Sequence, residues 1–297
     1  MSYRSVFAPG LFAGQTIVVT GGGSGIGRCV VHELTSLGAE VAIVGRKQAK
    51  LEAVLSEVEE DGGRASIHST DIRDEDGVVR VIDAILERHG RIDGLVNNAG
   101  GQYKANLDTI TTKGFEAVVR SNLTGGFIVM REVYNRWMKA NGGSIVNMIA
   151  DISNGWPGFA HSAASRGGML TLTESAATEW AAAGVRLNAV APGAIASSGL
   201  DTYDDEHTAF IQQQVVTGIP LQRFGTESEV SAAIVFLLSP AASFITGSTI
   251  RVDGGAPNAR EGWWKLEQNR ASEPFNGFHR ASGPAILTGT GNEVTGS

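Results

Sequence analysis

Short runs of apolar and β-branched residues alternate with longer helical patterns from Gln15 onward, and this alternation restricts the possible folds most strongly. Most of the short runs are continuously apolar, as expected for strands that are buried on both faces. Stretches such as 47–61 and 74–89 space Val, Ile and Leu as surface helices do. The pattern predicts an α/β fold, in which helices cover both faces of a parallel sheet. The expected strands are 16–20, 40–44, 64–69, 94–97, 144–149, 185–191 and 248–252.

The length of 297 residues, with 42% hydrophobic residues, is enough for a sizeable core. No internal repeat or linker-like segment interrupts the chain before about Gly255, so one continuous domain is the economical interpretation. We expect this domain at 14–255, preceded by an N-terminal arm at 1–13. A polar helical segment at 201–218 is of the kind that covers a substrate cleft.

Residues 256–297 form a C-terminal tail that is rich in Gly, Asn, Ser and Thr. It carries an aromatic pair, Trp263 and Trp264. We expect either a partly ordered surface tail or a segment that packs on a neighbouring subunit or near the substrate.

Charge and cysteine content exclude several classes of function. A net charge of −7 provides no positive field to attract nucleic acid or an anionic membrane. The single cysteine, Cys29, cannot close an internal disulfide, and no Cys and His spacing indicates a metal site. The sequence has no run of 18 apolar residues and no secretory stretch at its start. We therefore expect a cytoplasmic protein that binds no metal, nucleic acid or membrane.

A glycine-rich turn, TGGGSGIG at 20–27, joins the first expected strand to a helical pattern. Gly21 permits a sharp exit from the strand, Gly25 lets the backbone approach a pyrophosphate, and Gly27 allows close packing of helix on sheet. The helix N-terminus directs its amides at the phosphates. A purely structural turn is the alternative. The residues of this turn expected to bind a dinucleotide cofactor are Gly21, Ser24, Gly25, Ile26 and Gly27.

The second expected strand ends without the acidic residue that usually binds the ribose of NAD. Instead, Arg46 can form a forked contact with a 2′-phosphate, and Lys47 adds positive charge. This pair favours NADPH over NADH, although Arg46 could also be an ordinary cation at a helix start. Asp71, followed by Ile72, comes after the third strand, where it is placed to accept from an adenine amino group or to cap a helix.

Further motifs follow the glycine-rich turn in order: NNAG at 97–100, SNL at 121–123 and PG at 192–193. With these motifs, the chain resembles the short-chain dehydrogenases/reductases over about residues 14–255. The resemblance implies a single doubly wound, Rossmann-like domain with a seven-stranded parallel sheet, a nicotinamide cofactor, and a homodimer or homotetramer. It also implies cofactor contacts by Asn98, Ala99, Gly100, Arg166, Pro192, Gly193, Ile195 and Ser197.

Within the family, the chain is most similar to peroxisomal trans-2-enoyl-CoA reductases and related bacterial proteins. This likeness implies a role in lipid metabolism, with an acyl-CoA or another activated alkene as the small-molecule substrate. The stretches that carry it are NAGGQ at 98–102, SNLTG at 121–125, GGSIVN at 142–147, AHSAASRGG at 160–168 and LSPAASFITG at 238–247.

Ordinary family members use a Ser, a Tyr and a Lys for proton chemistry, with Tyr and Lys four positions apart. Here the matching positions hold Ala150 or Ile149, then Ser162 and Arg166, so only the family's Asn remains, at Asn122. An alkyl hydroxyl is a poor general acid near neutral pH. Arg166 keeps the positive charge and can hold the nicotinamide ribose, but it cannot usefully release a proton.

Reduction of a C=C bond conjugated to a thioester makes a different demand, because negative charge collects on the thioester oxygen as an enolate. Ser162 with Asn122 or a backbone amide could donate hydrogen bonds to that oxygen. The proton for the α-carbon would come from water or from Asp151, His161, Tyr103 or Tyr134, which the sequence does not rank. Asp151 follows the fifth strand, where ligand crevices form.

The leading hypothesis is therefore an NADPH-dependent reductase of trans-2-enoyl-CoA thioesters or similar activated alkenes. One alternative is an NAD(P)-dependent carbonyl reductase or alcohol dehydrogenase, acting on 3-oxoacyl or similar substrates with an unusual acid. Another is a non-redox lyase or an NADPH-binding sensor on the same fold.

Overall fold

The computed structural model describes residues 2–202, 205–259, 265–267, 269, 272–284 and 287. Trp263 and Trp264 lie outside the described residues. A seven-stranded parallel sheet has the order β3-β2-β1-β4-β5-β6-β9, and a second, two-stranded sheet pairs β7 with β8. The strands are β1 (Thr16–Thr20), β2 (Glu40–Gly45), β3 (Arg64–Ser69), β4 (Gly94–Asn97), β5 (Gly143–Met148), β6 (Val185–Pro192), β7 (Ile195–Ala196), β8 (Gly225–Thr226) and β9 (Thr249–Val252).

Helices follow most of the strands, as parallel crossovers require. The α-helices are α1 (Gly25–Ser36), α2 (Gln48–Glu60), α3 (Glu75–His89), α4 (Thr112–Val119), α5 (Gly125–Val133), α6 (Lys139–Asn141), α7 (Ala160–Trp180), α8 (Asp205–Gly218) and α9 (Glu227–Leu238). Two π-helical turns are η2 (Arg120–Thr124) and η3 (Tyr134–Met138). Short 3₁₀ turns are η1 (Leu107–Thr109), η4 (Ala181–Ala183), η5 (Leu200–Thr202), η6 (Pro240–Ala242) and η7 (Ala256–Asn258).

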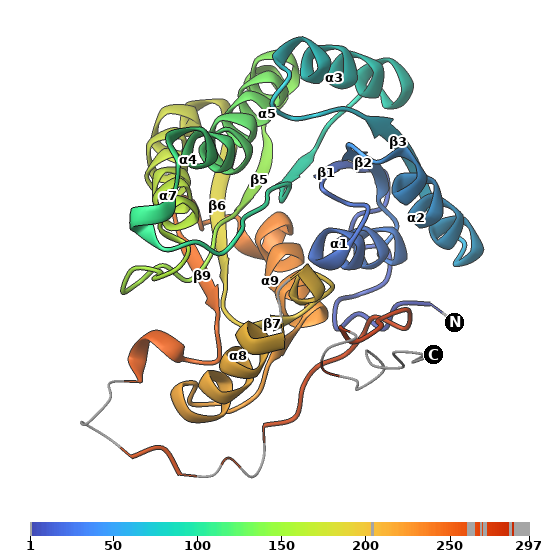
Figure 1. Cartoon of the computed structure of the whole chain (residues 1–297). Coiled ribbons are helices and arrows are strands. Elements are labelled where there is room, and N and C mark those ends of the chain that lie inside the picture. The colour runs from blue at the N-terminus through green and yellow to red at the C-terminus, as the bar shows by residue number, and fades with distance from the viewer. Residues whose placement is uncertain are drawn as a thin grey trace, which may run out of the picture.

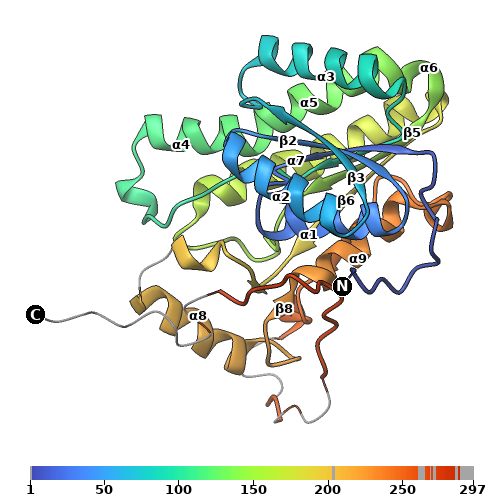
Figure 2. The same ribbon diagram turned by 90° about the vertical axis from the view of Figure 1, so that its right-hand side faces the viewer.

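Two helical layers cover the sheet (Figures 1 and 2). In β1, Ile17 and Val19 face a core shared with α1, α2 and α9, whereas Val18 faces a core shared with α3, α5 and α7. This alternation buries both sides of each central strand and explains why the strands are continuously apolar. The predicted α/β fold and seven-stranded sheet are confirmed, with strand ends shifted by one residue at β2, β5, β6 and β9.

The predicted polar helical segment at 201–218 corresponds to the end of η5 and to α8, which lies apart from the two helical layers and next to β7 (Figure 1). Tyr203 and Asp204 are outside the described residues. Within the described residues, no helix combines the length and apolar character needed to cross a lipid bilayer.

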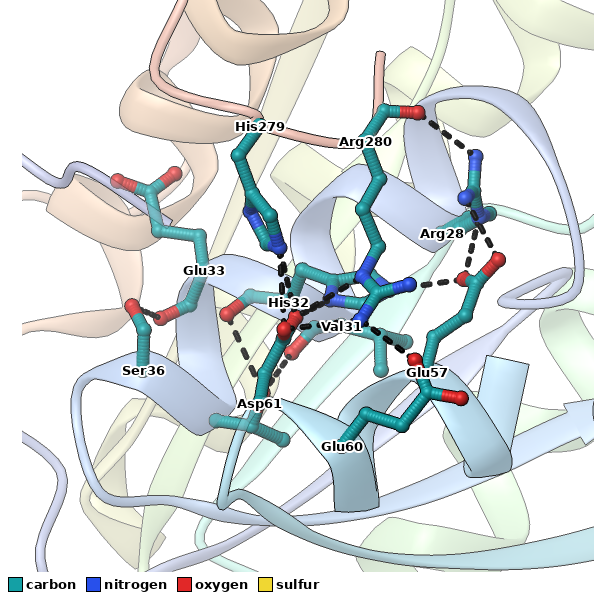
Figure 3. Close-up of polar contacts among 11 residues, drawn as sticks. Arg28, Val31, His32, Glu33, Ser36, Glu57, Glu60, Asp61, His279 and Arg280 are labelled. Carbon is teal, nitrogen blue, oxygen red and sulfur yellow. Dashed lines mark hydrogen bonds and ion pairs between the residues drawn. The ribbon is translucent and has the colours of Figure 1, made fainter. Parts of the chain in front are cut away.

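The C-terminal segment 272–284 packs against its own chain, beside the N-terminal arm and α1 (Figure 1). Phe278 is only 2% exposed and stacks on Tyr3 of the arm. His279 and Arg280 contact Asp61 at the end of α2, and Asp61 also contacts His32 of α1 (Figure 3). This part of the tail therefore docks on the same chain by a buried ring and a charged cluster.

Candidate active site

The carboxyl ends of β1 and β4 are joined by side chains at the point where the strand order reverses. Thr20 Oγ1 accepts hydrogen bonds from the backbone amides of Asn98 and Ala99, at 3.0 and 2.9 Å. In return, Asn98 Nδ2 donates to the carbonyl oxygen of Thr20 at 3.0 Å. In open α/β sheets, ligands bind in the crevice at this reversal. The predicted cofactor residues at 20–27 and 98–100 are thus brought together.

The glycine-rich turn has the geometry of a phosphate cradle. Gly21 and Gly25 have φ values of 70° and 56°, in the left-handed region that favours glycine. A Cβ on Gly27 would collide with the carbonyl oxygen of Gly21, so the helix start can lie this close to the strand only without a side chain. The side chain of Ser24, the N-cap residue of α1, makes no cap hydrogen bond. The first-turn amides are therefore left for an anion, and this turn fits a dinucleotide pyrophosphate.

A cluster of charged side chains follows the carboxyl ends of β2 and β3. The side chain of Arg46 is 64% exposed, and its Nη1 lies 3.9 Å from Asp71 Oδ2. Asp71 also accepts hydrogen bonds from Arg73, with Nη2 2.5 Å from Oδ2, and these bonds lower the pKa of the Asp71 carboxyl. Asp71 does not cap α3, because the N-cap residue is Asp74. Lys47, the N-cap residue of α2, is exposed at this edge. Arg73 was missed in the sequence, although it stands two positions after a predicted site residue.

Ile72 was predicted to contact the cofactor. In the structure it is 6% exposed and belongs to the core on the side of α3 and α5. A Cβ on Gly125 would come within 2.8 Å of its side chain, so Ile72 fills the space beside the start of α5.

Asn122 and Arg166 meet around Gly100. A Cβ on Gly100 would lie 2.7 Å from both Asn122 Oδ1 and Arg166 Nη2. Asn122 lies in the π-helical turn η2, a local widening that often marks functional sites. Its Oδ1 accepts from the amide of Gly101 at 2.8 Å, while its buried Nδ2 finds no partner among the described residues. An unpaired buried donor of this kind is suited to a ligand or an ordered water.

Arg166 is a half-buried residue of α7 that donates through Nη1 to the carbonyl oxygen of Met148 at 2.5 Å. Desolvation lowers the pKa of its guanidinium to about 10, so the group remains a cation at neutral pH. Its Nε is buried and lacks a partner within the described part of the chain. The site therefore contains a desolvated positive charge, and the Nε–H of this guanidinium can still donate a hydrogen bond to a ligand.

Ser162 is fully buried at the start of α7, one turn from Arg166. Its hydroxyl donates to Gln102 Oε1 at 2.7 Å. The neighbouring His161 is also fully buried, and neither of its ring nitrogens has a partner among the described residues. The ring of Tyr103 packs edge-on against His161, with centroids 4.5 Å apart. The loop 100–103 thus covers the start of α7.

Asp151 lies on the wall of a cavity of about 380 Å³ beyond the end of β5. Its amide donates to the carbonyl oxygen of Pro192, and its Oδ1 accepts from the amide of Ser153, as in a turn. Asp151 therefore helps to form a turn after β5 and also lines this cavity.

The loop after β6 carries the last predicted cofactor residues. Gly193 follows β6, and a Cβ there would come within 2.8 Å of the backbone of Asp253, the residue after β9. The close approach of these two strand ends therefore requires glycine at this position. Ile195 is buried in β7, whereas Ser197 lies in the following loop.

Tyr134 was among the candidate proton donors. It begins η3 and stacks on Trp180 at the end of α7, with ring centroids 4.0 Å apart and planes 6° apart. These rings pack on the core beneath α3 and α5, whereas Ser162 begins the opposite end of α7. Tyr134 stacks on the last residue of the 21-residue helix α7, whereas Ser162 lies in its first turn, so the two side chains are far apart.

Comparison with known proteins shows the family of this chain. Residues 21–257 match the family model described as enoyl-(acyl carrier protein) reductase. A peroxisomal 2,4-dienoyl-CoA reductase from Danio rerio is 33% identical, over 86% of this chain and 85% of the relative. A 3-oxoacyl-[acyl-carrier-protein] reductase from Staphylococcus aureus is 35% identical, over 81% of this chain and 97% of the relative. The solved structure of a citronellol catabolism dehydrogenase from Pseudomonas aeruginosa is 56% identical, with a TM-score of 0.77, over 86% of this chain and 99% of that chain.

The chain belongs to the short-chain dehydrogenase/reductase family. Membership makes it an NAD(P)H-dependent oxidoreductase and favours redox chemistry over the lyase and sensor alternatives. In this short-chain dehydrogenase/reductase the glycine-rich turn leads into α1, and α7 carries Ser162 and Arg166.

One further residue of this short-chain dehydrogenase/reductase was missed by sequence reasoning. Gln102 was part of a motif that carried the family resemblance, but no role was expected for it. The structure shows that it holds the Ser162 hydroxyl across 60 positions of sequence. A polar side chain directly after the NAG motif was the available signal.

Proposed function

We propose that this protein uses NADPH to reduce a C=C bond conjugated to a thioester, with trans-2-enoyl-CoA as the substrate class. The observation that carries the proposal is the pair Ser162 and Arg166, which stand where a Tyr and a Lys would serve carbonyl reduction. The dienoyl-CoA reductase relatives support an acyl-CoA substrate.

Carbonyl reduction ends with a proton on the substrate oxygen, so it needs an acid whose pKa is near the working pH. Ser162 is a poor acid for that step, and Arg166 holds its proton up to about pH 10. Alkene reduction needs only transient stabilisation of negative charge on the thioester oxygen. Preorganised donors supply such stabilisation without titrating.

When bound, a reduced nicotinamide would supply the hydride for the β-carbon of the substrate. The electron pair of the C=C bond then moves toward the thioester oxygen, where Ser162 Oγ and Asn122 Nδ2 donate hydrogen bonds. In the structure the Ser162 hydroxyl donates to Gln102 Oε1 at 2.7 Å, so the thioester oxygen would replace Gln102 as its acceptor. A proton added at the α-carbon completes the saturated thioester, with water, Asp151, His161 or Tyr103 as its source.

NADPH is proposed over NADH because three cations, Arg46, Lys47 and Arg73, gather at the edge expected to receive the adenosine ribose. Asp71 neutralises part of this charge through its ion pair with Arg73. A 2′-phosphate would find Arg46 still accessible, since that side chain is 64% exposed.

Carbonyl reduction is the second candidate, because relatives named as 3-oxoacyl-[acyl-carrier-protein] reductases are 35% identical. The name of the 56% identical dehydrogenase also supports an alcohol or carbonyl substrate. The deciding assay follows the loss of NADPH absorbance with trans-2-enoyl-CoA beside matched 3-oxoacyl-CoA. Oxidation only with the enoyl thioester supports alkene reduction. Preference for the 3-oxo substrate would overturn it.

The oligomeric state, the location and the domain bounds are part of the same proposal. We propose a homodimer or homotetramer in the cytoplasm, with a domain at 14–255 that carries both cofactor and substrate sites. Light scattering coupled to gel filtration measures the assembly, and a monomeric mass would contradict that part.

A further inference from the structure

A carboxyl group that no motif predicted lies against the glycine-rich turn. Glu227 is the first residue of α9, about 200 positions from the turn in sequence. If Gly25 carried a Cβ, the nearest atoms to it would be Glu227 Oε1 and Ser198 Oγ, each at 3.8 Å. Gly25 is the residue that lets the backbone approach a pyrophosphate. Glu227 therefore borders the space in which the cofactor phosphates are expected.

Glu227 makes no hydrogen bond or ion pair with any residue that the structure describes. The nearest cation on α1 is Arg28, but its guanidinium binds both carboxylate oxygens of Glu57 at 2.7 Å (Figure 3). Before β8, Arg223 is likewise paired with Glu229 at 2.7 Å. Both of these cations are thus bound to carboxylates other than Glu227.

Burial raises the pKa of Glu227 to about 7, and the charge of Arg28 only partly opposes this shift. Among titratable groups on the facing elements, Cys29 of α1 is buried and its thiol pKa is raised, so it stays uncharged near neutral pH. The C-terminal residues 275–278, which contact the start of α9 through Ser228 and Glu229, carry no titratable side chain. Burial also raises the pKa of the Glu33 carboxyl on α1, but that group accepts hydrogen bonds from Ser231, Ser5 and Tyr3. Glu227 is the carboxyl that lies against Gly25.

We propose that Glu227 is a cofactor-contacting residue that binds in its neutral form, donating its carboxyl proton in a hydrogen bond to a pyrophosphate oxygen. The inference rests on the cofactor binding that the proposed function requires. An ionised carboxylate beside a diphosphate is repelled, whereas a carboxylic acid is a donor. Binding of one cofactor to the ionised protein therefore consumes one proton from solution.

The sign of the pH dependence follows from linkage. Below about pH 7 the free protein already carries the proton, so affinity is independent of Glu227 ionisation there. Above it the proton must be taken up, and affinity falls by up to about tenfold per pH unit. At pH 8 a group with a pKa of about 7 is about nine-tenths ionised, so the expected uptake is about 0.9 proton per cofactor.

The test is titration calorimetry of NADPH into the full chain at pH 6 to 8.5, in buffers that differ in heat of ionisation. NADH is measured in parallel, because the 2′-phosphate of NADPH itself titrates near pH 6. Glu227→Gln keeps a donor but cannot titrate, so it should lose the uptake and bind at pH 8 about as tightly as at pH 6. Glu59→Gln, an exposed carboxylate on α2, removes the same charge and should behave as the parent.

Glu227→Ala removes both the titratable group and the hydrogen-bond donor, whereas Glu227→Gln removes only the titratable group. A comparison of the two variants therefore isolates the effect of the hydrogen bond. Glu227→Ala should also lose the proton uptake, but it should bind more weakly than Glu227→Gln at every pH, and thermal unfolding checks that both variants fold. Equal proton uptake in the parent and in Glu227→Gln would overturn the inference while leaving the reductase proposal intact. Failure of the parent to bind either dinucleotide would overturn both.

Discussion

The hydroxyl of Ser162 donates to Gln102 Oε1 at 2.7 Å, and Ser162 lies one helical turn from the desolvated cation of Arg166. The hydroxyl proton is therefore directed at an amide carbonyl, and a substrate oxygen must displace that acceptor to receive it. Ser162 is thus a donor that does not itself titrate near neutral pH, which suits an enolate better than a developing alcohol.

Replacing Ser162 by Ala should lower kcat with trans-2-enoyl-CoA by about 100-fold, because one donor to the enolate oxygen is lost. The affinity for NADPH should not change, since the proposed partner of the hydroxyl is the substrate oxygen and not the cofactor. Stopped-flow absorbance and a fluorescence titration measure the two quantities. Ser165→Ala is the matched control, because this buried hydroxyl on the same helix only donates to the carbonyl oxygen of Ser162. Equal losses in both variants would count against a role in charge stabilisation.

Arg166→Met should weaken NADPH binding by about tenfold or more, because it removes a desolvated cation and leaves the Met148 carbonyl without its donor. Arg166→Lys should retain most of the affinity, since it keeps the charge. In the parent this contribution should be constant from about pH 6 to 9, because the lowered pKa of about 10 keeps the guanidinium protonated. Fluorescence titration checks all three, and parental affinity in Arg166→Met would contradict the assignment.

Arg46→Asp should lower the affinity for NADPH by about 100-fold and leave that for NADH nearly unchanged, because a carboxylate repels the 2′-phosphate but accepts from a ribose hydroxyl. Parallel titrations with both dinucleotides measure the change in preference. Arg80→Asp, at another exposed cation on α3, should alter neither affinity. A similar loss for both cofactors would place Arg46 outside the 2′-phosphate site.

Asp61→Asn should lower the free energy of unfolding by about 2 kcal/mol at pH 7, because His32, His279 and Arg280 lose a charged acceptor. Burial raises the pKa of Asp61, but hydrogen bonds from Arg280 and His279 outweigh it and lower the pKa overall. A carboxylate with a depressed pKa stabilises the folded state above its unfolded value of about 4 and loses this effect as the pH falls through its folded pKa. The difference between parent and variant should therefore shrink as the pH falls below about 4 and through the lowered pKa of Asp61.

Urea denaturation at neutral and acidic pH measures this effect. The control is Glu60→Gln, since the side chain of Glu60 is 61% exposed although it also contacts Arg280. Exposed pairs contribute little, so its effect should stay below about 0.5 kcal/mol. If the difference in the free energy of unfolding for Asp61→Asn did not depend on pH, the destabilisation would come from altered packing and not from the lost ionised carboxylate.

The strands of the main sheet and the glycine-rich turn could be predicted because their signals are local. A strand buried on both faces is continuously apolar, and the turn needs glycine at Gly21 and Gly25, where φ is positive. The short pair β7 and β8 was not predicted, because strands of two residues are too short to show a periodic pattern.

The candidate site could be predicted only in part. The order and spacing of the motifs led us to predict that Asn122, Ser162 and Arg166 belong to one site. They provided no basis for choosing among the four candidate side chains for the proton donor. The stacking of Tyr134 on Trp180 and the edge-on contact of Tyr103 with His161 depend on how α7 packs on its neighbours. Such side-chain directions are set by packing between elements and leave no pattern along the chain.

By itself, therefore, the sequence determined the α/β class and the glycine-rich turn at 20–27, because both depend on residue type at short spacing. Only the tertiary structure decided which carboxyl borders the phosphate space and where the C-terminal segment docks. Glu227 reaches Gly25, and Phe278 packs on Tyr3, across about 200 positions or more. Contacts between residues so far apart exist only after the strands and helices have packed together.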